Sequence, residues 1–281
     1  MKLLVTGAAG QLGAVVVRSF SAAGHDVVAA TRDALDVTDH AAVLRAVGAA
    51  RPDVVVNCAA FNDVDGAEDR CDAALDVNAF AVRSLARAAA EAGAALVHYG
   101  TDFVFDGRAA SPYRETDRPN PQSVYASSKL LGEWFAADVP RHYVLRVESL
   151  FGGPAARSSI DRILEALVAG RTARVFVDRV VSPTYVEDCA MATEALLARD
   201  APPGLYHCVN AGHTSWYELA REVARQAGVE PRLEPVSVAS VTLKAPRPTY
   251  CALAIDKLRG VGIEMPTWQD AIRRHLEARR A

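Results

Sequence analysis

Short apolar runs alternate with longer amphipathic segments over the first 150 residues of the chain. The spacing predicts strands at residues 2–6, 27–30, 53–57, 95–99 and 142–147. It predicts helices at about 13–23, 39–48, 64–92 and 122–137, with a loop over 106–121. Strands that alternate with helices in this way are typical of a parallel sheet covered on both faces. We therefore expect an α/β fold with a doubly wound, Rossmann-type parallel sheet.

The alternation becomes irregular beyond residue 150. Eight prolines between positions 154 and 248 divide this half into short elements, because proline cannot continue a helix or donate to a central strand. We expect a smaller substrate-binding domain built mainly from residues 151–281. Residues 1–150 would form the nucleotide-binding domain, and about 183–203 would return to it.

Composition narrows the classes of function. The chain has 281 residues, 51% of them hydrophobic and 23% charged, and a net charge of −3. These values are ordinary for a globular enzyme and favour neither a nucleic acid nor an anionic membrane as partner. The five cysteines are scattered and no apolar run reaches 18 residues, which indicates a reducing, cytoplasmic location. Oligomeric state stays open, with a homodimer as one possibility.

A glycine-rich loop follows the first predicted strand. Its spacing is G-x-x-G-x-x-G, with Gly7, Gly10 and Gly13, and it includes Gln11 and Leu12. Such a loop lets the backbone approach a pyrophosphate, and the helix after it offers unpaired N–H groups and a positive dipole end. A glycine-rich turn alone is weak evidence, but its position between a strand and a helix predicts dinucleotide binding.

Residues after the second and third strands suggest the rest of the cofactor site. Arg32 follows the second strand, where an arginine can hold the 2′-phosphate of NADP, so NADPH is favoured over NADH. Arg32 could equally be a solvated loop charge. Asp36 and Val37 are expected at the adenine edge. The small residues Cys58, Ala59 and Ala60 end the third strand, where a cofactor would approach closely.

Tyr125 and Lys129 have the Y-x-x-x-K spacing within a predicted helix. Residues four apart share one helical face, so the phenol and the ammonium can point into one cleft. The lysine cation would lower the pKa of the tyrosine toward the range useful for general acid catalysis. Chance pairing is improbable because the chain contains only four lysines against 27 arginines.

Thr101 follows the fourth predicted strand, at the carboxyl edge where open α/β sheets bind ligands. Its hydroxyl could hydrogen-bond a substrate carbonyl and polarise it. The alternative is that Thr101 or Asp102 only caps a turn or a helix.

Together these motifs resemble the extended short-chain dehydrogenases, and most closely the dTDP-4-dehydrorhamnose reductase family. The resemblance covers almost the whole chain, and its most specific part is the stretch 101–107. Matching segments lie at 7–13, 35–39, 52–57, 77–79, 101–107, 125–133, 182–185, 204–207, 215–218 and 247–248.

The resemblance implies that Thr101, Tyr125 and Lys129 form the catalytic set. Hydride would pass from the nicotinamide of NADPH or NADH to C4 of a dTDP-4-dehydro-6-deoxyhexose in deoxysugar biosynthesis. Tyr125 would protonate the oxygen, and Lys129 would also hold the nicotinamide ribose. The substrate site implied by the family comprises Thr101, Asp102, Phe103, Ser149, Arg179 and Arg247.

The chain departs from the family pattern at several of these positions. Phe103 stands where a tyrosine is usual, Ser149 where a tryptophan is common, Gly100 where a serine is usual and Arg179 where a glutamine tends to occur. These differences make the reaction better supported than the substrate. Val15 replaces an acidic residue that takes part in a metal-bridged dimer in some members, so no metal is expected.

Three other functions compete with this hypothesis. One is a 4-ketoreductase or 4-epimerase that acts on a different nucleotide sugar with the same Tyr–Lys pair. A 4,6-dehydratase would need an Asp–Glu pair after the threonine, whereas Asp102 is followed by Phe103. The last is a non-catalytic NADP-binding regulatory subunit, as in the methionine adenosyltransferase β subunit, which the intact Thr101, Tyr125 and Lys129 argue against.

Overall fold

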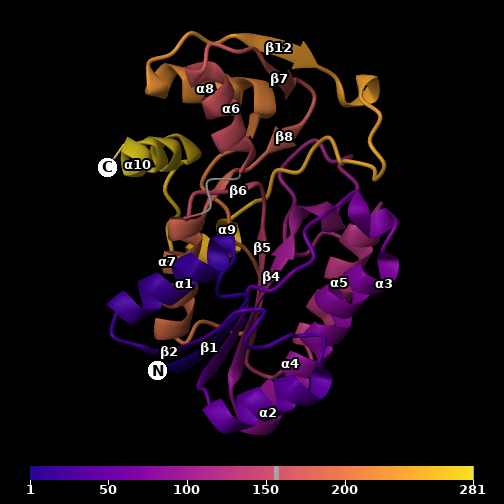
Figure 1. The fold of residues 1–281 in the computed structure, drawn as a ribbon, viewed down its shortest axis with the longest axis vertical. Coiled ribbons are helices and arrows are strands. Elements are labelled where there is room, and N and C mark those ends of the chain that lie inside the picture. The colour runs from indigo at the N-terminus through magenta and orange to yellow at the C-terminus, as the bar shows by residue number, and fades with distance from the viewer. Residues whose placement is uncertain (155–157, 281) are drawn as a thin grey trace.

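A six-stranded parallel sheet forms the centre of the protein in the computed structural model, which describes residues 1–154 and 158–280 (Figure 1). Its strands are β1 (Lys2–Thr6), β2 (Asp26–Ala30), β3 (Val54–Asn57), β4 (Ala95–Thr101), β5 (His142–Val147) and β10 (Gly204–His207). Their order across the sheet is β10-β5-β4-β3-β1-β2. This arrangement confirms the predicted α/β fold with a parallel, Rossmann-type sheet.

Ten helices longer than a single 3-10 turn are assigned within the described residues. They are α1 (Gln11–Ala22), α2 (His40–Ala50), α3 (Cys71–Leu75), α4 (Ala81–Ala92), α5 (Val124–Ala136), α6 (Ser159–Val168), α7 (Val186–Ala198), α8 (Trp216–Ala227), α9 (Asp256–Gly260) and α10 (Trp268–Arg280). A π-helical stretch, Asp76–Phe80, joins α3 to α4. The predicted helix at 122–137 is thus α5, and the helical stretch 64–92 is divided between α3 and α4.

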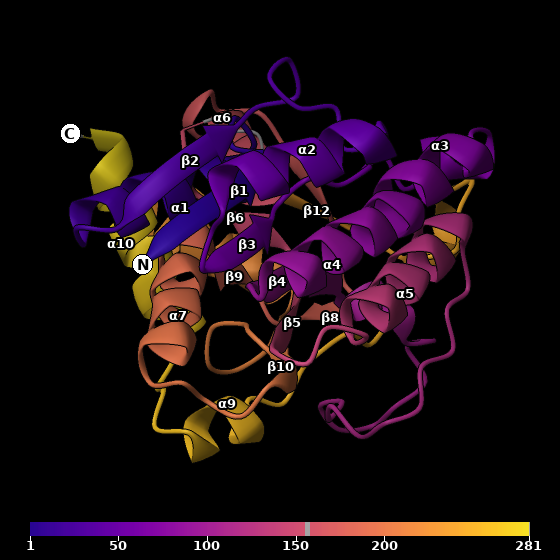
Figure 2. The same cartoon turned by 90° about the horizontal axis from the view of Figure 1, so that it is seen from below.

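Helices cover both faces of the sheet, and the strand sequence explains how. Leu3 and Val5 of β1 point into a core shared with α1 and α7. Leu4 of β1 and Val55 of β3 point into a second core shared with α2 and α4. Alternate residues of a strand face opposite sides, and both sets are apolar here because a parallel sheet is buried on both faces. Seen from below, α1 and α7 lie on one side of the sheet, and α2, α4 and α5 on the other (Figure 2).

A smaller layer lies beyond the carboxyl ends of the strands. Helices α6, α8 and α10 enclose a separate apolar core with two short parallel strands, β7 (Ala173–Phe176) and β12 (Leu233–Val236). Three further short strands link this layer to the main sheet: β6 (Leu150–Phe151), β8 (Val180–Val181) and β9 (Thr184–Tyr185); β8 pairs with β11 (Thr214–Ser215). The chain returns to the main sheet through α7, which packs on α1, and through β10, which pairs with β5.

Candidate active site

A cavity of about 930 Å³ lies at the carboxyl ends of β1, β3, β4 and β5. The order in which strands are added across the sheet reverses at β1, which has β2 on one side and β3 on the other. Ligands of open α/β sheets bind in the crevice at such a switch point, and the volume falls within the ~300–1,000 Å³ of small-molecule sites. The fold therefore places the cavity where the sequence predicted the chemistry.

The glycine loop between β1 and α1 forms one wall of this cavity. Gly7 has a φ of 65°, and a Cβ there would lie 2.6 Å from the amide nitrogen of Ala59. Gly13 lies in the first turn of α1, and a Cβ there would lie 2.2 Å from the carbonyl oxygen of Gly7. Only glycine permits this close packing, which leaves the N-terminus of α1 directed at the cavity.

Arg32, Asp36 and Val37 line the far end of the cavity, after β2. The Asp36 carboxylate accepts hydrogen bonds from the backbone N–H of Thr38 at 2.9 Å and from its hydroxyl at 2.7 Å, and these bonds lower the pKa of Asp36. These bonds hold the turn at Asp36 and keep its carboxyl ionised. Arg32 is the cation available at this end for a negatively charged group on a ribose.

Asn57 was not among the predicted site residues, but it lines the cavity beside the glycine loop. Asn57, the last residue of β3, accepts hydrogen bonds from the Thr6 hydroxyl at 2.7 Å and from the Ala59 amide at 3.1 Å. Its side-chain nitrogen lies 3.1 Å from Nδ1 of His98. The sequence did contain a signal for Asn57, because it is the single polar residue of the strand and stands at its end. Asn57 holds the turn through Cys58, Ala59 and Ala60, all of which line the cavity.

Tyr125 and Lys129 occupy one face of α5 and both line the cavity. Ser123 caps the helix by accepting from the Ala126 amide, so the face begins at a fixed position. Lys129 is buried, and its Nζ donates to the carbonyl oxygen of Tyr99 at 2.5 Å. Burial lowers the pKa of Lys129 to about 8.

The electrostatics of Tyr125 differ from the sequence expectation. Burial, and then the nearby Asp102 carboxyl, raise the pKa of Tyr125 above its usual value, while a hydrogen bond with Thr101 opposes the rise. The predicted lowering of this pKa by Lys129 is wrong, because burial and Asp102 dominate. The Lys129 ammonium donates to the carbonyl oxygen of Tyr99. A raised pKa keeps the phenol protonated at neutral pH, and a cation brought beside it would move the pKa back toward the range of efficient general acid catalysis.

Thr101 ends β4 beside Tyr125. Its Oγ1 accepts from the Phe103 amide at 3.2 Å and donates to Asp102 Oδ1 at 3.0 Å. Thr101 therefore does cap the turn at Phe103, as the alternative reading expected. Its side chain also lines the cavity.

Among the side chains expected to bind the sugar, Phe103 and Ser149 line the cavity, whereas Arg179 and Arg247 lie outside its lining, over the Phe103 ring. Phe103 packs edge-on against Tyr125, with ring centroids 5.8 Å apart. The guanidinium groups of Arg179 and Arg247 lie 5.8 and 5.9 Å from the centre of the Phe103 ring. Ser149 has a φ of 46°, in the left-handed region that most side chains avoid.

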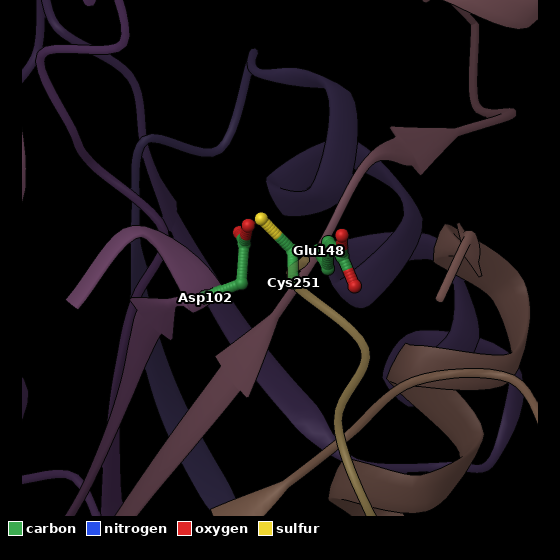
Figure 3. Close-up of side chains that lie close together, drawn as sticks. All are labelled: Asp102, Glu148 and Cys251. Atoms are coloured by element: carbon green, nitrogen blue, oxygen red, sulfur yellow. The ribbon is translucent and has the colours of Figure 1, made fainter. Parts of the chain in front are cut away.

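A buried acidic cluster was not singled out by the sequence. Asp102, Glu148 and Cys251 gather where β4 and β5 end, and their ligand-type atoms all lie within 4.8 Å of one another (Figure 3). Glu148 directly follows the apolar β5, and this position was the only local signal for it. Cys251 comes from a loop a hundred residues away, so only the fold could join it to the other two.

Sixteen of the predicted site residues line the cavity. They are Gly7, Gly10, Gln11, Leu12, Arg32, Asp36, Val37, Cys58, Ala59, Ala60, Thr101, Asp102, Phe103, Tyr125, Lys129 and Ser149. Gly13 supports the loop from behind, and Arg179 and Arg247 stand next to the cavity over Phe103. Val15 is buried in the core beneath α1.

Comparison with known proteins agrees with this geometry. A family model described as the RmlD substrate binding domain matches residues 1–280. The chain belongs to this family. Membership confirms the resemblance found in the sequence and makes the chain an NAD(P)-dependent oxidoreductase.

Individual relatives match over nearly their whole length. The chain is 39% identical over 286 residues to dTDP-4-dehydrorhamnose reductase of Mycobacterium tuberculosis (strain ATCC 25618 / H37Rv), covering 99% of this chain and 93% of that one. It is 38% identical over 277 residues to a Streptomyces antibioticus protein named probable dTDP-4,6-dihydroxy-2-methyloxan-3-one 4-ketoreductase, covering 97% and 94%. A crystal structure of the Bacillus anthracis dTDP-4-dehydrorhamnose reductase in complex with NADP superposes with a TM-score of 0.94 at 30% identity, covering 99% of each chain.

Among the helices of the described residues, none has the length and apolar character needed to span a membrane.

Proposed function

We propose that this protein reduces the C4 ketone of a dTDP-4-dehydro-6-deoxyhexose, in deoxysugar biosynthesis, with a nicotinamide dinucleotide as reductant. The convergence of Thr101, Tyr125 and Lys129 on a cavity that begins at a glycine loop supports this most strongly. Two of the relatives are named as reductases of 4-keto groups on dTDP sugars. We place the reaction in the cytoplasm and leave a homodimer as one possible assembly.

A nicotinamide dinucleotide held at the glycine loop would supply the hydride that C4 of the ketone receives. Tyr125 donates its phenolic proton to the carbonyl oxygen as the new C–H bond forms, so ketone, hydride and proton give the alcohol. The Thr101 hydroxyl hydrogen-bonds the same oxygen and orients it. Lys129, whose Nζ donates to the Tyr99 carbonyl oxygen, would hold the nicotinamide ribose, and its positive charge would stabilise the Tyr125 phenolate.

The chain's own residues fit the cofactor. The backbone of Gly7, Gly10 and Gln11 would receive the pyrophosphate at the N-terminus of α1, where an added Cβ on Gly7 would collide with Ala59. Arg32 would hold a 2′-phosphate, which favours NADPH, and the structure of the Bacillus anthracis relative is a complex with NADP. We further propose that residues 1–150, with about 183–203, bind the dinucleotide and that residues 151–281 mainly bind the sugar nucleotide.

The test is consumption of NADPH by the purified protein with a panel of dTDP- and GDP-linked 4-keto-6-deoxyhexoses. We expect turnover with at least one dTDP sugar and conversion of its ketone to an alcohol, detected by mass spectrometry with deuterated NADPH. Absence of turnover with every member would refute the proposal. Product isomerised without net NADPH oxidation would instead establish an epimerase, and NADPH binding without any reaction would favour a regulatory subunit.

A further inference from the structure

The acidic cluster contains three metal-ligand donors that the proposed chemistry does not use. Asp102 and Glu148 are each 2% exposed and line the cavity, and Cys251 is 1% exposed. One donor atom from each side chain lies within 4.8 Å of the other two. In Figure 3 the Asp102 carboxyl and the Cys251 sulfur point toward one another, with Glu148 beside them. Within residues 1–154 and 158–280, no other set of three such side chains comes together in this way.

Each carboxyl group of the cluster has one oxygen held by the protein and one oxygen unpaired. Asp102 Oδ1 accepts from the Thr101 hydroxyl at 3.0 Å, and Glu148 Oε2 accepts from the backbone N–H of Ser182 at 2.6 Å. Asp102 Oδ2 and Glu148 Oε1 are buried without a hydrogen-bond partner among the described residues. A buried carboxylate oxygen without a partner is costly. Carboxylates that bind metals are oriented in this way, by an outer hydrogen bond on the group that leaves an oxygen for the ion.

The fold positions the third donor, Cys251, independently of the other two. Its backbone N–H donates to the carbonyl oxygen of Val180 at 2.9 Å, which holds this part of the chain against β8. The thiol lies 3.6 Å from the carbonyl oxygen of Pro248, a weak contact that a metal–sulfur bond can replace. Three segments that are far apart in the sequence therefore present one donor each to the same point.

The spacing of the donors suits a single small cation. Zinc binds carboxylate oxygen at about 2.0–2.2 Å and thiolate sulfur at about 2.3 Å. Two such donors on a tetrahedral ion lie roughly 3.4–3.7 Å apart. Because the three donor atoms lie within 4.8 Å of one another, side-chain shifts of about 1 Å would complete the set.

The charges around the cluster balance only when a divalent cation is included. Asp102 and Glu148 as carboxylates and Cys251 as a thiolate carry three negative charges. Arg179 favours the ionised forms of both carboxyls and supplies one positive charge. A divalent ion supplies the other two, so the buried site is neutral overall, which avoids the cost of an unpaired buried charge.

We propose that Asp102, Glu148 and Cys251 bind one divalent cation of the zinc type, with the remaining coordination position toward the cavity. A mixed thiolate and carboxylate set favours zinc over magnesium or calcium, which prefer oxygen donors alone. As the metal–sulfur bond forms, the Cys251 thiol proton, and any proton on the carboxyls, passes to water. The ion would tie the ends of β4 and β5 to the loop that carries Cys251.

The proposed site is independent of the reductase function and of the substrate. It also differs from the metal-bridged dimer whose absence is expected from Val15, because Val15 belongs to α1.

The first test uses cobalt(II) alone, as a spectroscopic substitute for zinc, added to the purified full chain after treatment with a chelator. We expect one equivalent to bind and to produce a sulfur-to-cobalt charge-transfer band, because the thiolate is a ligand. Cys251→Ser should abolish the band. Cys71→Ser, at an exposed cysteine outside the cluster, is the matched control and should keep it.

The second test measures zinc affinity by competition with a chromophoric chelator. Glu148→Gln keeps an oxygen that can accept from Ser182 but loses the charge, so we expect zinc to bind at least about 10²-fold more weakly, the upper end for loss of an outer partner. Glu218→Gln, the same substitution on the exposed surface of α8, should bind zinc as wild type does. Zinc should raise the urea midpoint of wild type but not of Glu148→Gln, and equal midpoints without metal would show that the variant is folded.

Two results would overturn the proposal. One is a wild-type protein that binds no cobalt. The other is equal binding by wild type, Cys251→Ser and Glu148→Gln, which would mean adventitious binding elsewhere on the surface. A protein that binds cobalt through Cys251 but reduces no ketone would refute the reductase and leave the metal site established.

Discussion

The two ends of the cavity are built in different ways. At the end with the glycine loop the backbone approaches closely, and a Cβ on Gly7 would collide with Ala59. At the end that we propose for the sugar the wall is made of side chains, including Phe103 and Glu148, which follow two separate strands, β4 and β5. A backbone wall suits a cofactor common to many enzymes, whereas a wall of side chains can change with the substrate while the fold stays the same.

Tyr125 stands where the two ends meet, and its removal should have the largest effect. Tyr125→Phe deletes the proton donor but keeps the ring that packs on Phe103. We expect kcat to fall by about 10²- to 10⁴-fold, the scale of a positioned general acid. Stopped-flow turnover and fluorescence titration of NADPH measure the two quantities separately.

NADPH affinity should be unchanged in Tyr125→Phe, and Tyr217→Phe, on α8 away from the cavity, should be active. A loss of NADPH affinity equal to the loss of rate would show that the two ends are not separable.

The nucleotide end can be disturbed without touching the sugar end. In Gly13→Ala the new Cβ would lie 2.2 Å from the Gly7 carbonyl oxygen, so the loop must move. Overpacking of this kind costs about 1–3 kcal/mol, and we expect weaker NADPH binding together with a lower free energy of unfolding. Isothermal titration calorimetry and urea unfolding measure the two effects.

Gly48→Ala is the matched control for Gly13→Ala. Nothing lies within 4 Å of a Cβ at Gly48, which is inside α2. The exchange should raise stability by up to about 1 kcal/mol, because alanine favours the helix. Equal destabilisation by both substitutions would mean that the close approach at Gly13 is unimportant.

We expect the choice between NADPH and NADH to depend on the side chain of Arg32. Arg32→Ala should weaken NADPH binding by roughly tenfold, the low end for a hydrogen bond to a charged group, and should leave NADH binding nearly unchanged. Arg87→Ala, on the exposed face of α4, controls for a general loss of positive charge. Equal weakening of both cofactors by Arg32→Ala would contradict the preference for NADPH.

The last prediction concerns a pH-dependent gain in stability. Burial lowers the pKa of Lys129 from 10.5 to about 8, so the folded state binds its proton less tightly than the unfolded chain does. The charged lysine therefore costs stability fully below pH 8, and the cost disappears as the pH rises toward 10.5. Lys129→Met should unfold at higher urea than wild type at pH 7, with the advantage shrinking above pH 8.

The features of the cavity differ in how far the sequence could predict them. The strands, the glycine loop, and the Tyr125–Lys129 pair depend on short-range spacing, which a single sequence contains in full. The acidic cluster depends on Cys251 meeting Asp102 across about 150 residues. The turn after β3 depends on the bond between Asn57 and Thr6, which are 51 residues apart. No local pattern encodes such contacts. The predicted lowering of the Tyr125 pKa failed for a similar reason, since burial and the Asp102 carboxyl, which the fold brings to Tyr125, raise it.

The position of β10 has a consequence for how the protein is made. The open edge of β5 is covered only when β10 pairs with it, and roughly 60 residues separate the ends of these two strands. At about 5–20 residues per second, a ribosome needs several seconds to add them. Throughout that interval the nascent chain presents an unpaired strand edge, a template for aggregation. A fragment that stops near residue 150 would keep that edge exposed permanently, so expression of the isolated N-terminal half should give insoluble protein.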